Sequence, residues 1–170
     1  RHGTLVNYVA IVKTDEFRDE GWRIPSTREA VLAHFQGGLP LIAALIGATD
    51  PATVSRWALC DRPPQPRWVR ERVVLLGDAA HPMLPYMGQG AAMGFEDAVV
   101  LARCLAEIDS PDAALAAYQY TRQPRATLVH RGSAARADMW EARDVKSGLS
   151  GDAVDEEREL FPYDAGQTPL

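Results

Sequence analysis

The alternation of apolar and polar positions predicts short strands in the first half of the chain. Residues 5–12 are almost continuously apolar and rich in β-branched side chains, which is typical of a strand. Residues 54–59 show a similar, shorter pattern. Residues 73–76 are apolar at every position and predict a strand buried on both faces of a parallel sheet. Residues 16–24 are polar and broken by glycine, so we expect a loop or a hairpin return there.

Helical patterns occupy much of the remaining chain. Ser26 and Glu29 form a capping-box pattern, which predicts a short helix that ends near Gly37. Pro40 begins a second short helix, which we expect to reach Ile46. Prolines then interrupt regular structure between these elements and the strand at 73–76; they are Pro63, Pro64 and Pro66.

Two longer helices are predicted after that strand. Residues 88–108 form the first, because apolar side chains recur at intervals near 3.6 residues and define a core-facing stripe. The members of this stripe are Phe95, Val99, Ala102 and Leu105. Ser110 and Pro111 provide a cap and a first helical residue for the second helix. Pro124 should kink or restart it before it continues toward Trp140.

Composition narrows the class of protein. The chain has 170 residues, 46% of them apolar, which fits a globular α/β domain rather than a disordered chain. Its net charge of -5 argues against a nucleic-acid partner, and no apolar run approaches the roughly 20 residues that cross a bilayer. Cys60 and Cys104 form no disulfide framework, and four scattered histidines form no zinc pattern. We therefore expect a cytoplasmic protein without a metal site.

The strongest candidate for chemistry lies where the strand at 73–76 ends. Gly77 permits a sharp turn, and the carboxylate of Asp78 is suited to accept hydrogen bonds from sugar or polyol hydroxyls. Gly88 and Gly90 precede a helix whose first amide groups favour negative charge. The alternative, an ordinary turn with glycines that only allow tight packing, remains open on these residues alone.

The glycines do not form a dinucleotide fingerprint. Gly88, Gly90 and Gly94 have one spacer too many for G-x-G-x-x-G and do not directly follow the strand. The sequence therefore contains no phosphate-binding glycine loop of its own.

The order of these motifs resembles a known family. Residues 77–82, with Pro85, Gly90 and the Glu-Asp-Ala segment 96–98, are similar to the second FAD motif of the aromatic-ring flavoprotein monooxygenases. The pattern is closest to the branch that contains salicylate hydroxylase and 6-hydroxynicotinate monooxygenase. The segment from Tyr118 to Arg125 also resembles that branch, and the similarity covers roughly residues 50–140.

The resemblance implies a role for each motif. Asp78 would bind the ribityl hydroxyls of FAD, and the amides of Gly90, Ala91 and Ala92 would face the pyrimidine edge of the flavin. The implied cofactor-binding set is Gly77, Asp78, Pro85, Gly88, Gln89, Gly90, Ala91 and Ala92. The implied catalytic pair is Pro85, near the flavin ring, and Tyr86, near the substrate.

Other polar residues are expected to be structural. His81 directly follows the turn, and we expect it to support the loop rather than act as a catalyst. Cys104 should be part of the core. The arginines around the prolines should form a solvated rim; they are Arg62, Arg67, Arg70 and Arg72.

The implied fold is the carboxy-terminal part of a glutathione-reductase-like FAD-binding fold, with part of a mixed or antiparallel substrate-domain sheet. Residues 1–60 would end the substrate domain, 61–135 would return to the FAD domain, and 136–170 would form a tail that is irregular from Lys146. The chain would then be a portion of a longer enzyme, inactive alone, whose amino-terminal part carries the glycine loop.

The implied reaction is the hydroxylation of an aromatic acid by FAD, NAD(P)H and molecular oxygen. A homodimer is a further expectation. Two alternatives stay open: a related FAD-dependent halogenase or reductase, and a helical protein-interaction module without a cofactor.

Overall fold

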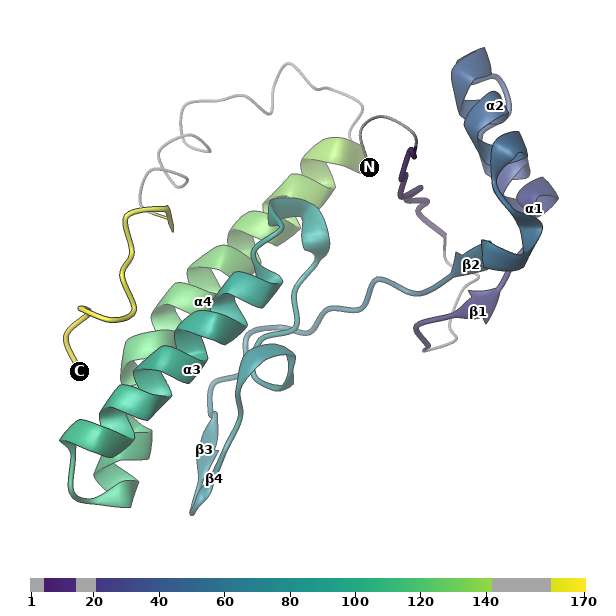
Figure 1. The fold of residues 1–170 in the computed structure, drawn as a ribbon. Helices are drawn as coiled ribbons and strands as arrows, with labels where there is room; N and C mark the ends of the chain where they lie inside the picture. The colour runs from purple at the N-terminus through teal and green to yellow at the C-terminus, as the bar shows by residue number, and fades with distance from the viewer. Residues whose placement is uncertain (1–4, 15–20, 142–159) are drawn as a thin grey trace. The chain divides into compact units, whose positions relative to one another are not determined.

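The computed structural model describes residues 5–14, 21–141 and 160–170. The chain forms two compact units, Arg1–Ala58 and Leu59–Leu170, and both combine helices with short strands (Figure 1). Within the described ranges, no helix combines the length and the apolar character needed to cross a membrane. The mixed helix-and-sheet composition confirms the coarse α/β expectation.

The first unit contains a two-stranded antiparallel pair and two helices. Strand β1 (Ile24–Pro25) pairs with β2 (Ser55–Arg56), and the helices are α1 (Arg28–His34) and α2 (Pro40–Ala48). The N-cap of α1 is Thr27, whose hydroxyl accepts from the Ala30 amide at 3.1 Å. The expected Ser26 cap is therefore wrong by one residue.

Two strand predictions in this unit are wrong. Residues 5–12 form no regular structure, and their large apolar side chains are exposed. A strand is stable only when a neighbour satisfies its backbone groups, and no described strand pairs with this run. The expected strand at 54–59 is reduced to β2, while the expected loop at 16–24 ends in β1. Residues 15–20 of that loop lie outside the described part.

The second unit begins with a hairpin where a parallel strand was predicted. Strand β3 (Val69–Arg70) pairs antiparallel with β4 (Val73–Val74), and Glu71 in the turn between them has a φ of 54°. Val73 is 66% exposed, so the expected burial on both faces is wrong. The apolar run has no parallel neighbour among the described strands and pairs instead with the residues that precede it.

Two long helices dominate the second unit. Helix α3 spans Gly90–Glu107, as the sequence predicted within two residues, and α4 spans Pro111–Glu141 along its side (Figure 1). The predicted core stripe of α3 is wrong, because Phe95 is 75% exposed. The buried face of α3 comprises Met93, Asp97, Val100 and Cys104. Cys104 is thus in the core, as expected.

Helix α4 begins as predicted but does not break at its proline. The Ser110 hydroxyl accepts from the Ala113 amide at 3.4 Å, and Pro111 is the first helical residue. Pro124 lies inside one continuous helix, and buried residues on both sides of it, Tyr118 and Val129, pack into the core. This packing outweighs the hydrogen bond that a proline removes.

The carboxy-terminal residues 160–170 pack on the helices. Leu160 is buried with Met93 and Val129, and Arg103 donates to the carbonyl oxygens of Ala165 and Thr168 at 3.0 and 2.8 Å. The predicted surface tail is therefore wrong for this segment, although its backbone is irregular. Residues 146–159 of the predicted tail lie outside the described part.

One side-chain amide connects the hairpin to α4. The Gln119 side-chain oxygen accepts from the backbone amides of Trp68 and Val69 at 2.7 and 3.0 Å, and Trp68 is buried.

We expect Gln119→Ala to lower the free energy of unfolding by about 1–3 kcal/mol, because it leaves two amides without an acceptor. Urea unfolding measures this loss. Gln119→Glu keeps an acceptor and should lose less, and Tyr120→Ala, at an exposed neighbour, should match the wild type.

Candidate functional site

A buried carboxylate lies at the centre of the second unit. Asp97 of α3 is fully buried, and its Oδ2 accepts from the Gly77 amide at 3.0 Å. The same oxygen lies 2.6 Å from His81 Nε2. Its Oδ1 accepts from Arg122 Nε of α4 at 2.8 Å. One side chain thus joins α3 to α4 and to the loop that follows β4.

The surroundings of Asp97 keep it ionised. Burial alone would raise the pKa of its carboxyl, but hydrogen bonds from His81, Arg122 and the Gly77 amide outweigh burial, and the pKa is lowered. The pKa of Tyr118 is raised, first by burial and then by the Asp97 charge. Its hydroxyl donates to the Leu75 carbonyl at 3.2 Å, so it acts as a neutral donor.

A second carboxylate continues the network toward the carboxy-terminal segment. Glu96 forms an ion pair with Arg122 at 2.7 Å and accepts hydrogen bonds from two nitrogens of Arg125 at 2.7 Å each. Arg125 also donates to the Leu160 carbonyl at 3.0 Å and lies 3.8 Å from the centre of the Tyr163 ring. Each of these charged side chains therefore has at least one partner of opposite charge, which buried ions require.

The Gly77–Asp78 turn lies against α3. Gly77 begins a short 3-10 helix, Gly77–Ala79, with a φ of 57°. A Cβ on Gly94 would lie 3.9 Å from the Gly77 Cα, so the two backbones approach closely. Asp78 is exposed, and its carboxylate has no partner among the described residues. Arg62 fixes the turn from outside by donating to the Ala79 carbonyl at 3.0 Å.

The start of α3 carries free donors. Gly88 has a left-handed φ of 64°, which redirects the chain into the helix. Gln89 occupies the N-cap position without a side-chain cap bond, and α3 begins at Gly90. The first intrahelical bond in this turn is donated by Met93, so the amides of Gly90, Ala91 and Ala92 have no helical acceptor.

The two expected catalytic residues lie in the loop before α3. Pro85 and Tyr86 belong to the 3-10 helix Pro85–Met87; Pro85 is exposed and Tyr86 is half-buried. Ser133 of α4 donates a hydrogen bond to the Leu84 carbonyl, which fixes the loop to the long helix.

The structure brings the turn and the helix start close together. Gly94, which contacts Gly77, is one helical turn after Gly90, a separation of about 6 Å along the helix axis. The exposed Asp78 carboxylate follows Gly77 in this turn, and the helix start one turn before Gly94 favours negative charge. This geometry can hold a ligand with both a polyol chain and an electron-rich edge.

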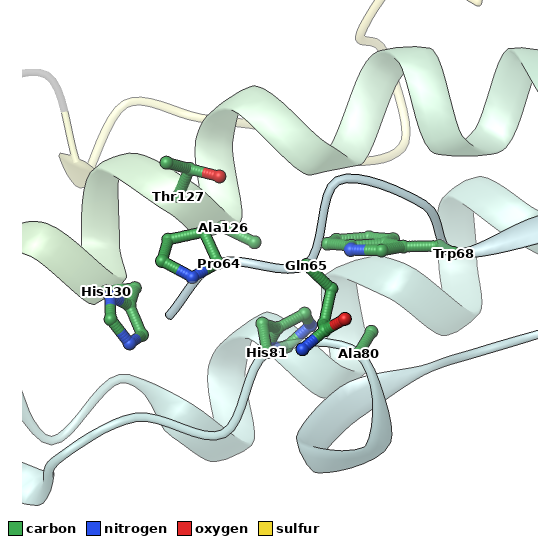
Figure 2. Close-up of a pocket in the computed structure, with 8 residues that line it drawn as sticks. All are labelled: Pro64, Gln65, Trp68, Ala80, His81, Ala126, Thr127 and His130. Carbon is green, nitrogen blue, oxygen red and sulfur yellow. The ribbon is translucent and has the colours of Figure 1, made fainter. Parts of the chain in front are cut away.

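A small cavity lies next to the residues that follow the turn, Ala80 and His81. Figure 2 shows His81, His130 and Trp68 around it, with Pro64 and Gln65 from the proline-rich segment. Its volume is about 10 Å³, which accommodates one water molecule and no flavin. His81 is 4% exposed and packs on the Trp68 ring, with centroids 5.3 Å apart, in agreement with its expected structural role.

The sequence analysis assigns no role to Asp97 and Arg122, which hold the Gly77–Asp78 turn in place. Asp97 enters the sequence analysis only within the Glu-Asp-Ala segment 96–98, and Arg122 only within the segment from Tyr118 to Arg125. The sequence does carry a signal that Asp97 is buried, since it is four residues after Met93 and three before Val100, on the same helix face.

The four arginines of the proline-rich region are exposed as expected, but Arg62 also binds the turn. No group of three or more metal-ligating side chains occurs among the described residues.

Comparison with known proteins agrees with this geometry. Residues 1–133 match the family described as FAD binding domain. The chain belongs to this family. The expected resemblance is thereby confirmed, and the reading as a cofactor-free interaction module loses its support.

Curated relatives and solved structures refine the comparison. The chain is 43% identical over 126 residues to 6-hydroxynicotinate 3-monooxygenase of Pseudomonas fluorescens, covering 73% of this chain and 32% of the relative. It is 36% identical over 160 residues to salicylate hydroxylase of Pseudomonas putida, covering 88% and 36%. A structure of Klebsiella pneumoniae HpxO with FAD and uric acid aligns with a TM-score of 0.61 at 32% identity, covering 82% and 36%. The chain spans about one third of the length of these proteins.

Asp97 provides a direct test of the network. We expect Asp97→Asn to lower the free energy of unfolding by about 3–5 kcal/mol, because it removes one partner of a buried ion pair. Glu107→Gln is the matched control, since Glu107 is exposed and its ion pair with Arg103 should contribute less than about 1 kcal/mol. Equal losses in urea unfolding for the two variants would contradict the central role of Asp97.

The lowered pKa of Asp97 also predicts an acid dependence. The unfolded chain binds a proton near the ordinary value of 3.8, and the folded chain binds it only at lower pH. The stabilisation from Asp97 is therefore complete above that value and is lost as the pH falls through the folded-state pKa. Unfolding free energies measured from neutral to acid pH should fall steeply in wild type. The fall should be shallower in Asp97→Asn; identical slopes would refute this origin.

Proposed function

We propose that this chain forms part of the FAD site of a flavoprotein monooxygenase. The enzyme would hydroxylate an aromatic acid with NAD(P)H and molecular oxygen. The observation that carries the proposal is the exposed Asp78 carboxylate in a turn whose Gly77 packs on Gly94, one helical turn after the free amides that begin α3. Membership in the FAD binding domain family supports the same cofactor.

The residues present fit FAD in two respects. Asp78 would accept hydrogen bonds from the ribityl hydroxyls, since its carboxylate has no competing described partner. The amides of Gly90, Ala91 and Ala92 would donate to the pyrimidine edge of the flavin, where the helix dipole favours negative charge. Gly88 and Gln89 would shape this approach, because no atom lies within 4 Å of a Cβ built on Gly88.

Pro85 and Tyr86 would face the reacting side. When bound, FAD supplies the transfer of electrons from NAD(P)H to oxygen. Pro85 is exposed next to the helix start and would limit the space over the flavin ring. Tyr86 is half-buried and would orient the aromatic substrate with its hydroxyl. The loop that carries both residues would exclude water from the ring.

Two curated relatives support the proposed substrate class. Their names include a hydroxynicotinate and a salicylate enzyme, both acting on aromatic carboxylic acids. These names denote monooxygenases or hydroxylases, which favours hydroxylation over halogenation. The remaining two thirds of such an enzyme would supply the FAD pyrophosphate site and the rest of the substrate pocket. The region 61–135 would be the returning FAD segment, and residues 1–60 the end of the substrate domain.

Asp78 tests the proposal in a hybrid enzyme. This chain would replace the matching segment of the Pseudomonas fluorescens relative, with which it shares 43% identity. We expect Asp78→Ala to weaken FAD binding about ten- to a hundredfold, because a hydrogen bond to a charged group contributes about 1.5–3 kcal/mol. Flavin absorbance and titration measure this. Asp109→Ala, at an exposed position outside the site, is the control; unchanged flavin content in Asp78→Ala would remove Asp78 from the site.

The printed chain alone gives a second test. We expect these 170 residues to retain no FAD and to oxidise no NAD(P)H when purified without a partner. They contain no glycine loop for the pyrophosphate. A yellow, stoichiometric flavin complex of this chain alone that consumes NAD(P)H would contradict the proposal.

A further inference from the structure

A buried hydroxyl of α4 contacts the loop that precedes α3. The Ser133 side chain is fully buried and donates a hydrogen bond to the carbonyl oxygen of Leu84, 49 residues earlier in the chain. Met83 and Met87, on either side of Leu84, pack against a buried cluster that includes Val129, one helical turn before Ser133. Apolar packing thus holds the loop on the helix, while the hydrogen bond, which is directional, fixes one carbonyl within it.

The accepting carbonyl belongs to the peptide unit between Leu84 and Pro85. A peptide unit is planar, so the Leu84 oxygen lies close to one plane with the ring nitrogen of Pro85 and the carbon atoms bonded to it. The proline ring also restricts its own φ to about -65°. Leu84 has a φ of -64° and a ψ of 149°, the extended conformation that a residue before proline favours. A donor that fixes the Leu84 carbonyl therefore fixes the orientation of the Pro85 ring as well.

The position of Tyr86 depends on that of Pro85. Both residues belong to the 3-10 helix Pro85–Met87, which the Gly88 amide closes by donating to the Pro85 carbonyl at 2.9 Å. Pro82 and Pro85 have no backbone N–H, so the loop has fewer donors of its own with which to fix its shape. The direction of the Tyr86 side chain is thus set in part by a contact that the loop makes with α4.

We propose that Ser133 is a positioning residue for the aromatic substrate, acting through Leu84 on Pro85 and Tyr86. This inference rests on the proposed function, in which Pro85 limits the space over the flavin ring and Tyr86 orients the substrate. Ser133 is fully buried and would itself touch neither ligand. A loop that is fixed before the substrate arrives loses less conformational entropy on binding, and it holds the substrate ring in one orientation.

The experiment uses the same hybrid enzyme, in which this chain replaces the matching segment of the Pseudomonas fluorescens relative. Substrate affinity is measured by titration with 6-hydroxynicotinate, the compound in the name of that relative. We expect Ser133→Ala to raise the dissociation constant about three- to tenfold, the range that the loss of one neutral hydrogen bond produces.

The fate of the oxygen gives a second readout. Each NAD(P)H consumed with one molecule of oxygen yields either hydroxylated product and water or hydrogen peroxide. We call the share that yields hydroxylated product the product yield. We expect Ser133→Ala to lower the product yield, because a substrate ring that is held in several orientations receives the oxygen atom less often.

Gln123→Ala is the matched control. The Gln123 side chain also donates from α4 to the carbonyl of a residue before a proline, that of Gln65, at 2.6 Å. This contact fixes the proline-rich segment and not the loop before α3, so its loss should leave substrate affinity and product yield unchanged. Ser133→Thr keeps the hydroxyl and should stay close to the wild type. Ser133→Cys keeps the side-chain size with a weaker donor and should give an intermediate result, also where Ser133→Ala does not fold.

Hydrogen exchange tests the loop without FAD or substrate. The Gly88 amide is bonded to the Pro85 carbonyl, so its exchange reports how often the 3-10 helix opens. We expect Ser133→Ala to raise the exchange rate of this amide about three- to tenfold, because one hydrogen bond of the closed loop is lost. Gln123→Ala should exchange there as the wild type does.

Three results would overturn the proposal. The first is wild-type affinity, product yield and exchange in Ser133→Ala. The second is an equal loss in Ser133→Ala and Gln123→Ala, which would indicate a general loss of stability. The third is faster exchange at Gly88 with unchanged affinity and product yield, which would limit Ser133 to a structural role. A hybrid that binds no FAD even with the wild-type chain would instead refute the proposed function, and exchange at Gly88 would still decide whether Ser133 fixes the loop.

Discussion

The fold of the second unit depends on the charge of one buried carboxylate. An ionised side chain inside a protein must be surrounded by donors, or its desolvation would unfold the structure. Asp97 meets this requirement with donors from three segments: the Gly77 amide, the His81 ring and the Arg122 guanidinium. Each donor therefore has a fixed place. The turn, the loop after it and the register of α3 against α4 all follow from satisfying that one charge.

The periodicity of the sequence predicted the helices well and their orientation poorly. The boundaries of α3 follow from glycines and apolar spacing, which are local properties. Its buried face does not, because the helix is apolar on two sides and hydrophobic patterning cannot choose between them. The choice is made by the ion pair between Asp97 and Arg122, which are 25 residues apart. The strand predictions are wrong for a related reason. A strand forms only where a neighbouring strand pairs with it, and the local sequence pattern does not identify that neighbour.

The candidate site could be located from the sequence, but the residues that hold its turn in place could not. The motif with Gly77 and Asp78 indicated a ligand-binding turn, and glycines before a helix indicated free amides. The structure shows the turn and the free amides, and it adds the contact of Gly77 with Gly94 that brings them close. Arg62 and Asp97 were not assigned as supports, because each acts on backbone atoms that sequence spacing does not relate to it.

The short separations within the network have a consequence for the order of folding. His81, Gly77 and Arg122 lie 16, 20 and 25 residues from Asp97 along the chain. Closing loops of this length costs little entropy, and contacts between near neighbours in sequence form early. The Asp97 cluster can therefore act as a nucleus that organises α3 before distant segments arrive. The turn at Gly77 and Asp78 would then reach its final shape early, while the rest of the second unit is still folding.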